Sequence, residues 1–145
     1  MRETYNLELE NYDGEQIELK LRINLLGIKN LQKKYIKSKN DLLADVVMNS
    51  ITDPSVMADI FKEALNYKGN ENTIHSGDDL YDLLVDNKYR GSFEFMKLMG
   101  GISVVSGIIS EDELNTVLNE LEKAKKDMEN GDISKYVESG ELTKN

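Results

Sequence analysis

The sequence predicts a mainly helical α+β domain in which an N-terminal β-hairpin precedes about five to six helices and a flexible C-terminal tail. Two stretches near the N-terminus alternate apolar and polar residues, a period typical of half-buried strands. From residue 25 onward, apolar residues instead recur every three or four positions, as on the buried face of a helix. After residue 130 apolar residues become sparse. We therefore expect a single domain at 1–130, with the hairpin at 4–23 and the helical body at 25–130, followed by a polar, mobile tail at 131–145.

The hairpin is predicted from the two alternating stretches, residues 5–10 and 17–23. Asp13-Gly14 lies between them, and glycine suits a tight turn because it adopts a positive φ without steric cost. The side chains expected to face a core are Leu7, Leu9, Ile17, Leu19, Leu21 and Ile23. A lone two-stranded hairpin is only marginally stable in water, so we expect either that helices cover it or that copies of the chain pair through its edges.

The first four helices are predicted from their caps and from apolar spacing. Asn24 is suited to cap the first, and Asp53-Pro54 starts the third, because Asp accepts hydrogen bonds from unpaired N–H groups and Pro fits the first turn. Ser76 is suited to cap the helix that follows the polar loop at 68–73. The expected buried residues are, in chain order, Leu25, Ile28, Leu31 and Tyr35; Leu42, Leu43, Val46 and Val47; Met57, Ile60, Phe61, Ala64 and Leu65; and Leu80, Leu83 and Leu84.

The fifth helix begins after Arg90-Gly91-Ser92 and is apolar nearly all round from Phe93 to Val105, which is typical of a central core helix. Gly100-Gly101 in its middle lowers the helix propensity by about 1 kcal/mol each relative to Ala. Close packing of a neighbouring backbone would compensate for this loss, and a kink is the alternative.

The sixth helix carries the strongest local signal in the chain. Ser110 and Glu113 form a capping box, and Ile109 and Leu114 stand where a hydrophobic staple requires apolar residues. Further along are Val117, Leu118 and Leu121, a charged stretch at 122–129, and an expected helix end at Asn130-Gly131.

Composition argues against several classes of function. Lys and Arg number 18 and Asp and Glu number 27, so the net charge is −9, and a field of this sign repels nucleic-acid phosphates. No apolar run approaches the roughly 18 residues that a membrane-spanning helix needs, and the N-terminus lacks the apolar core of a signal peptide. The chain has no cysteine, which fits a reducing compartment. We therefore expect a cytoplasmic protein that binds neither nucleic acid nor membrane.

The charge is unevenly distributed along the chain. Residues 20–39 carry seven basic and no acidic side chains, whereas residues 40–89 carry ten acidic side chains against three lysines. The two segments could meet within one copy, or the basic surface of one copy could meet the acidic surface of the next in a self-association. The sequence leaves both arrangements open.

No constellation of residues indicates catalysis. His75 lies near Asp78 and Asp79, but helix-start electrostatics account for the two acids, and no second His or Cys is present to complete a soft-metal site. Asp13-Gly14 lacks the surrounding acids of a calcium loop, and Ser106-Gly107 follows a helix rather than the strand of a nucleophile elbow. We therefore expect no enzyme activity, no metal site and no cofactor, and a role in protein–protein interaction.

Four segments follow one another in a particular order. They are the hairpin end Leu19-Lys20-Leu21-Arg22-Ile23, then Leu80-Tyr81-Asp82-Leu83-Leu84-Val85-Asp86, Phe93-Glu94-Phe95-Met96-Lys97-Leu98 and Ser110-Glu111-Asp112-Glu113-Leu114. This order, over roughly residues 4–125, resembles the tail assembly chaperones of long-tailed (siphovirus-type) phages and prophages of Gram-positive bacteria. The resemblance implies a small, acidic, non-catalytic protein that binds the tape-measure protein, keeps its long apolar helices soluble and helps to deliver tail-tube subunits.

The resemblance also implies a longer form of the protein, made by −1 ribosomal frameshifting near the end of the gene. The chain ends Thr143-Lys144-Asn145, and the codons ACA-AAA-AAC for these residues would contain the slippery heptamer A-AAA-AAC. The coding DNA tests this hypothesis, since an interrupted heptamer with no other slip site upstream would exclude it.

A chaperone of this kind needs an exposed apolar groove in which a client helix can lay its apolar face. We expect this groove along the last helix and the tail, at Val117, Leu118, Leu121, Met128, Ile133 and Tyr136. The alternative is that the first three are core residues. Leu118→Asp and Leu121→Asp should abolish client binding without unfolding the domain, whereas global unfolding of these variants would place both leucines in the core.

Two other functions compete with this one. Another structural component of a phage tail is disfavoured, because a tube subunit needs far more strand than one hairpin. A small acidic regulator that binds and inhibits a bacterial or phage enzyme is the second alternative. Gene order distinguishes it from a chaperone, whose gene should lie directly upstream of a very long tape-measure gene.

Overall fold

The computed structural model describes residues 3–67, 70, 74 and 76–129. Its elements are, in chain order, β1 (Tyr5–Glu10), β2 (Gln16–Leu21), α1 (Leu25–Tyr35), α2 (Leu43–Asn49), the short 3₁₀ helix η1 (Ser50–Thr52), α3 (Pro54–Leu65), α4 (Gly77–Asp86), α5 (Gly91–Val105) and α6 (Glu111–Asp127). The predicted fold class is confirmed, since a two-stranded hairpin precedes six α-helices over the described residues. The tail predicted at 131–145, including Thr143-Lys144-Asn145, lies outside the described residues.

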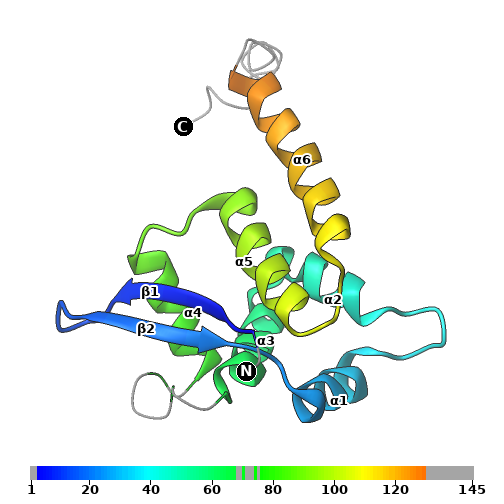
Figure 1. The fold of residues 1–145 in the computed structure, drawn as a ribbon, viewed down its shortest axis with the longest axis horizontal. Coiled ribbons are helices and arrows are strands. Elements are labelled where there is room, and N and C mark those ends of the chain that lie inside the picture. Colours follow the sequence, from blue (N-terminus) through cyan, green and yellow to red (C-terminus); the bar gives the residue numbers. More distant parts are fainter. Residues whose placement is uncertain (1–2, 68–69, 71–73, 75, 130–145) are drawn as a thin grey trace.

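The hairpin forms as expected and is covered by helices of the same chain. Its strands pair antiparallel, Gly14 in the turn has a φ of 81°, and the Asn11 side chain accepts hydrogen bonds from the N–H groups of Asp13 (3.0 Å) and Glu15 (2.9 Å). Five of the six side chains predicted to face a core are buried, and Ile17 is partly buried against the core. Helix α3 packs against β2, whereas α4 and α5 pack against β1 (Figure 1).

Two asparagine side chains bind the outer edges of the hairpin. Asn87 accepts a hydrogen bond from the Glu10 N–H (2.8 Å) and donates one to the Glu10 carbonyl (3.0 Å). Asn70 makes the same pair of bonds with Lys20, at 2.9 and 2.7 Å. A side-chain amide offers the same donor and acceptor as a peptide group, so each asparagine takes the place of one residue of a neighbouring strand. These bonds block one position on each edge against pairing with another chain.

The predicted caps begin their helices at the expected residues. The side chains of Asn24, Asp53 and Ser76 accept hydrogen bonds from N–H groups in the first turns of α1, α3 and α4. Ser110 and Glu113 make both bonds of the capping box, each 3.1 Å long. These side chains satisfy N–H groups that have no partner within their own helix, which explains why the four helices start where they do.

The predicted buried face of α1 is wrong at its first turn. Leu25 is 66% exposed, and Leu42, just before α2, is 59% exposed. The face of α1 that packs on the body is centred instead on Gly27 and Leu31. A Cβ on Gly27 would lie 2.8 Å from Ile23 Cγ2 and 3.2 Å from Glu63 Cβ of α3, so α1 packs closely on α3 at this glycine. Glycine has no apolar side chain and so does not contribute to the apolar pattern. The pattern therefore predicted a buried face that included Leu25, whereas the buried face includes Gly27.

At each of the two central glycines of α5, a side chain from another segment packs directly against the helix backbone. A Cβ on Gly100 would lie 2.1 Å from Leu114 Cδ1, and a Cβ on Gly101 would lie 2.3 Å from the Tyr5 ring. The close neighbours are therefore side chains rather than the backbone that we expected, and α5 continues through both glycines as one helix. Through this contact between Gly100 and Leu114, the first turn of α6 packs against α5.

Ser106 joins the end of α5 to the end of the hairpin. Its buried hydroxyl accepts a hydrogen bond from the Ile23 N–H at 2.8 Å. Ser106→Ala would leave this buried N–H unpaired, and we expect the free energy of unfolding to fall by about 1–3 kcal/mol. Ser103→Ala is the matched control, because the buried Ser103 hydroxyl donates only to the Met99 carbonyl within α5. Equal losses for the two variants in urea denaturation would contradict the assigned role of Ser106.

Candidate partner-binding groove

Helix α6 leaves the body in its second half, where every described residue after Leu121 is exposed. Figure 1 shows it rising away from the other elements, with only its lower part beside α5. Leu114 is its one buried residue over the described length. Val117, Leu118 and Leu121 are half-buried, and none of them belongs to the core cluster or packs against it. From Val117 onward, α6 thus presents apolar side chains that the core does not cover.

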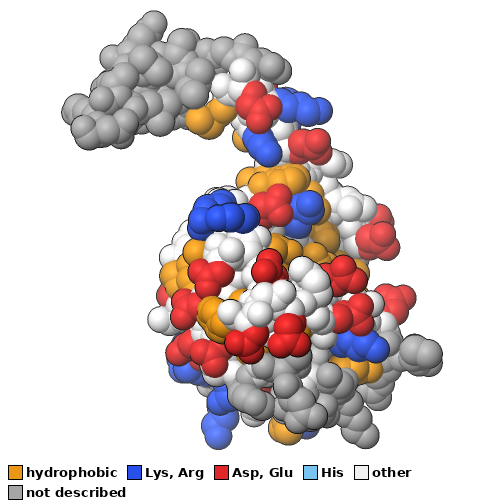
Figure 2. Space-filling view, turned by 90° about the vertical axis from the view of Figure 1, so that its left-hand side faces the viewer, with side chains coloured by type: hydrophobic (Ala, Val, Ile, Leu, Met, Phe, Trp, Pro, Cys, Tyr) orange, Lys and Arg blue, Asp and Glu red, His pale blue; other side chains and the backbone are white. Residues whose placement is uncertain are grey.

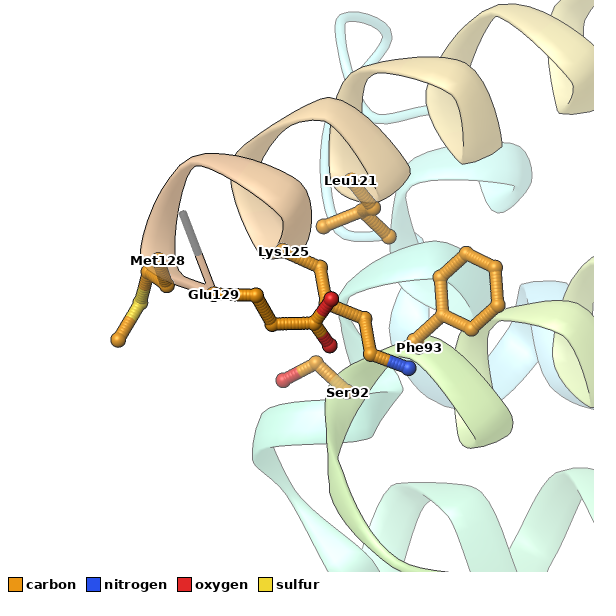
Figure 3. A pocket seen from close by; sticks show the side chains of 6 residues that line it. All are labelled: Ser92, Phe93, Leu121, Lys125, Met128 and Glu129. Carbon is orange, nitrogen blue, oxygen red and sulfur yellow. The ribbon is translucent and has the colours of Figure 1, made fainter. Parts of the chain in front are cut away.

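An apolar groove lies between the end of α6 and the start of α5. Its lining residues are Ser92 and Phe93 from the first turn of α5, and Leu121, Lys125, Met128 and Glu129 from the last turns of α6 and just beyond. It is open to solvent, has a volume of about 370 Å³, and its wall is almost entirely apolar. Figure 3 shows Leu121 and Phe93 facing one another from the two helices, with Met128 at the outer end.

The structure brings together only some of the predicted binding residues. Leu121 and Met128 line the groove, and Met128 is 38% exposed. Val117 and Leu118 lie on the same helix nearer the body and are not among the lining side chains. Ile133 and Tyr136 lie outside the described residues. The groove is therefore centred nearer to α5 than the sequence indicated.

Phe93 is the groove residue that sequence reasoning assigned to the core. Its neighbour Phe95 is buried on the face of α5 that also carries Leu98 and Ile102, whereas Phe93 is only half-buried. Two residues correspond to about 200° around a helix, so Phe93 and Phe95 cannot share a face. This offset was the signal in the sequence that could have placed Phe93 outside the core.

Two lysines bring positive charge to the groove. The Nζ atom of Lys125 lies 5.5 Å from the centroid of the Phe93 ring, and that of Lys97, one turn after Phe93 on α5, lies 5.4 Å from it. Ammonium groups at this distance are attracted to an aromatic ring, by about 0.5–1 kcal/mol at an exposed site. The Glu129 carboxylate lines the same groove. Figure 2 shows hydrophobic side chains where α6 leaves the body, and many acidic side chains over the body below them.

Among the described residues, the basic and acidic segments form one ion pair with each other within the chain. Lys34 Nζ lies 2.6 Å from Asp59 Oδ2, and the Tyr35 hydroxyl donates to the same oxygen. Burial by itself would raise the pKa of Asp59, but the two hydrogen bonds and the positive charges of Lys34 and Lys62 together hold that pKa below its ordinary value. Self-association of copies through 20–39 and 40–89 stays a prediction.

Comparison with known proteins does not assign the chain to a family. No family model, curated protein or solved structure matches it. Across the part of the chain that the structure describes, no helix is long and apolar enough to cross a membrane. The same residues contain no group of three or more His, Cys, Asp or Glu side chains that could hold a metal ion, and His75 lies outside them.

Proposed function

We propose that this protein is a non-catalytic tail assembly chaperone of long-tailed phages, which binds an amphipathic helix of the tape-measure protein and keeps that protein soluble. The observation that carries the proposal is the open apolar groove between α5 and α6. A helix with one apolar face lays that face into such a groove, through residues spaced three and four positions apart.

The charge of the protein suits this role. A client with long apolar helices aggregates unless its apolar faces are covered, and each bound copy of this chain would cover a stretch while adding a net charge of −9 to the complex. Repulsion between the coated complexes would keep them apart in the cytoplasm of the host cell. The tail-tube protein is a second partner that the same resemblance suggests.

Co-expression with the tape-measure protein encoded downstream tests the proposal. We expect a soluble complex that contains many copies of this chain per tape-measure chain, with the stoichiometry measured by size-exclusion chromatography and light scattering. If the tape-measure protein stays insoluble and this protein elutes alone, the chaperone function is excluded. The small acidic regulator of a bacterial or phage enzyme would then be the better explanation of the same groove.

A further inference from the structure

We propose that the groove selects helices whose apolar stripe is bordered by carboxylates, and that Lys97 and Lys125 are the residues that make this selection. The proposal rests on the function proposed above, because it specifies the kind of helix that the groove would hold. It follows from the placement of the two lysine ammonium groups relative to Phe93.

The ammonium groups converge on one side chain from two different helices. Lys97 belongs to α5 and Lys125 to α6, yet both Nζ atoms lie within 5.5 Å of the Phe93 ring centroid. Neither group makes an ion pair with any residue that the structure describes. Both side chains are exposed. An incoming helix that covered Phe93 would therefore meet two ammonium groups that form no ion pair with a carboxylate of the described residues.

This positive site contrasts with the rest of the molecule. The chain carries a net charge of −9, so a partner with acidic borders would be repelled from most of its surface. At the groove, the flexible lysine stems allow each ammonium group to leave the Phe93 ring and pair with a carboxylate of the partner. Glu129 also lines the groove, so we expect the acidic border of the partner helix beside Phe93 and the two lysines rather than beside Glu129.

Charged residues at the border of such a site affect the selectivity between partners more than the affinity for any one of them. Opposite charges add a modest attraction at an exposed rim, whereas like charges placed against one another exclude the wrong partner. We therefore expect the apolar wall to supply most of the affinity and the two lysines to supply most of the selectivity. Nucleic acid does not fit this site, because the wall formed by the described residues is almost entirely apolar and includes the Glu129 carboxylate.

Two designed peptides test the selection. Both carry the same leucine stripe and are held helical by a hydrocarbon staple; glutamates border the stripe in one peptide and lysines in the other. We expect the full-length chain to bind the glutamate peptide about tenfold more tightly in fluorescence anisotropy at low salt. The preference should shrink as added salt screens the exposed charges.

Charge variants identify the residues responsible. Lys97→Glu/Lys125→Glu should reverse the preference, and Lys97→Gln/Lys125→Gln should abolish it, with circular dichroism confirming that both variants fold. The matched control is Lys29→Glu/Lys33→Glu, which changes the net charge equally on exposed positions of α1. Equal binding of the two peptides to the unaltered chain would overturn the proposal, as would an equal shift in the control variant.

The outcome also separates this inference from the proposed function. If neither peptide binds while the tape-measure protein is still kept soluble, the inference is wrong and the chaperone function stands on another surface. If the peptides bind with the expected preference but the tape-measure protein stays insoluble, the groove selects acidic helices and the chaperone function is excluded.

Discussion

Leu121→Asp is expected to abolish binding of an apolar partner helix while leaving the free energy of unfolding nearly unchanged. Leu121 faces Phe93 across the groove and is only half-buried, so the substitution places a charge on the binding surface rather than in the core (Figure 3). A carboxylate on the apolar wall would lose its hydration when a partner helix docks. We expect the affinity for the partner to fall about thirtyfold or more, as it does when a binding hot spot is removed.

Asn119→Asp is the matched control for this substitution. Asn119 is exposed on the same helix, and two positions correspond to about 200° of rotation, so the new charge points away from the groove. Isothermal titration with the tape-measure protein or the glutamate-bordered peptide should show lost binding for Leu121→Asp alone. Urea denaturation should place both variants within about 1 kcal/mol of the unaltered chain. Global unfolding of Leu121→Asp would instead make Leu121 a core residue.

Gly77→Ala is expected to destabilise the fold more than any other glycine substitution in the described chain. A Cβ on Gly77 would lie 1.8 Å from the Ala58 carbonyl oxygen and 3.1 Å from the Lys62 backbone nitrogen. These atoms belong to the backbone of α3, which cannot rotate aside as a side chain can. Helix α4 would have to move away from α3 and loosen the core between them, at a cost of about 3 kcal/mol or more.

Gly107→Ala separates this steric cost from the cost of backbone conformation. Gly107 has a φ of 78°, but no atom lies within 4 Å of the position that its Cβ would take. The expected cost is therefore that of a left-handed conformation alone, about 1–2 kcal/mol. Chemical denaturation of the two variants should show the larger loss for Gly77→Ala. A loss no greater than that of Gly107→Ala would mean that α3 and α4 are less closely packed than the structure indicates.

The elements that sequence reasoning predicted correctly depend on contacts between near neighbours in the chain. Each of the caps Asn24, Asp53, Ser76 and Ser110 binds an N–H group two or three residues further on. The hairpin turn likewise depends on the positive φ of Gly14. The partners of these residues are present whatever the rest of the chain does, so their patterns remain readable without a structure.

The residues that were placed wrongly depend on which helix packs against which. Leu25 has helical spacing with Ile28, but α1 docks through Gly27, a residue that does not contribute to the apolar pattern. Ser76-Gly77 was recognised as a helix start, yet nothing in the sequence indicated that Gly77 touches the backbone of α3. A close approach between two helices depends on residues from two distant segments, and local sequence patterns do not show which residues meet.

Sequence reasoning predicted some residues of the groove correctly and missed others. The last helix was expected to carry the binding surface, and Leu121 and Met128 do line the groove. Phe93, Lys97 and Lys125 were not foreseen, because they meet only where α5 and α6 diverge. The contact of Leu114 with Gly100 holds the first turn of α6 on α5, whereas every described residue after Leu121 is exposed.

The sequence by itself thus determined the order of the hairpin and helices, the starting residues of the four helices with a capping side chain and the apolar character of the last helix. Only the tertiary structure decided which apolar side chains stay uncovered and which charges stand beside them. The physical reason is that caps, turns and periodicity arise from interactions within a few residues, whereas burial arises from the angle and distance at which remote helices pack.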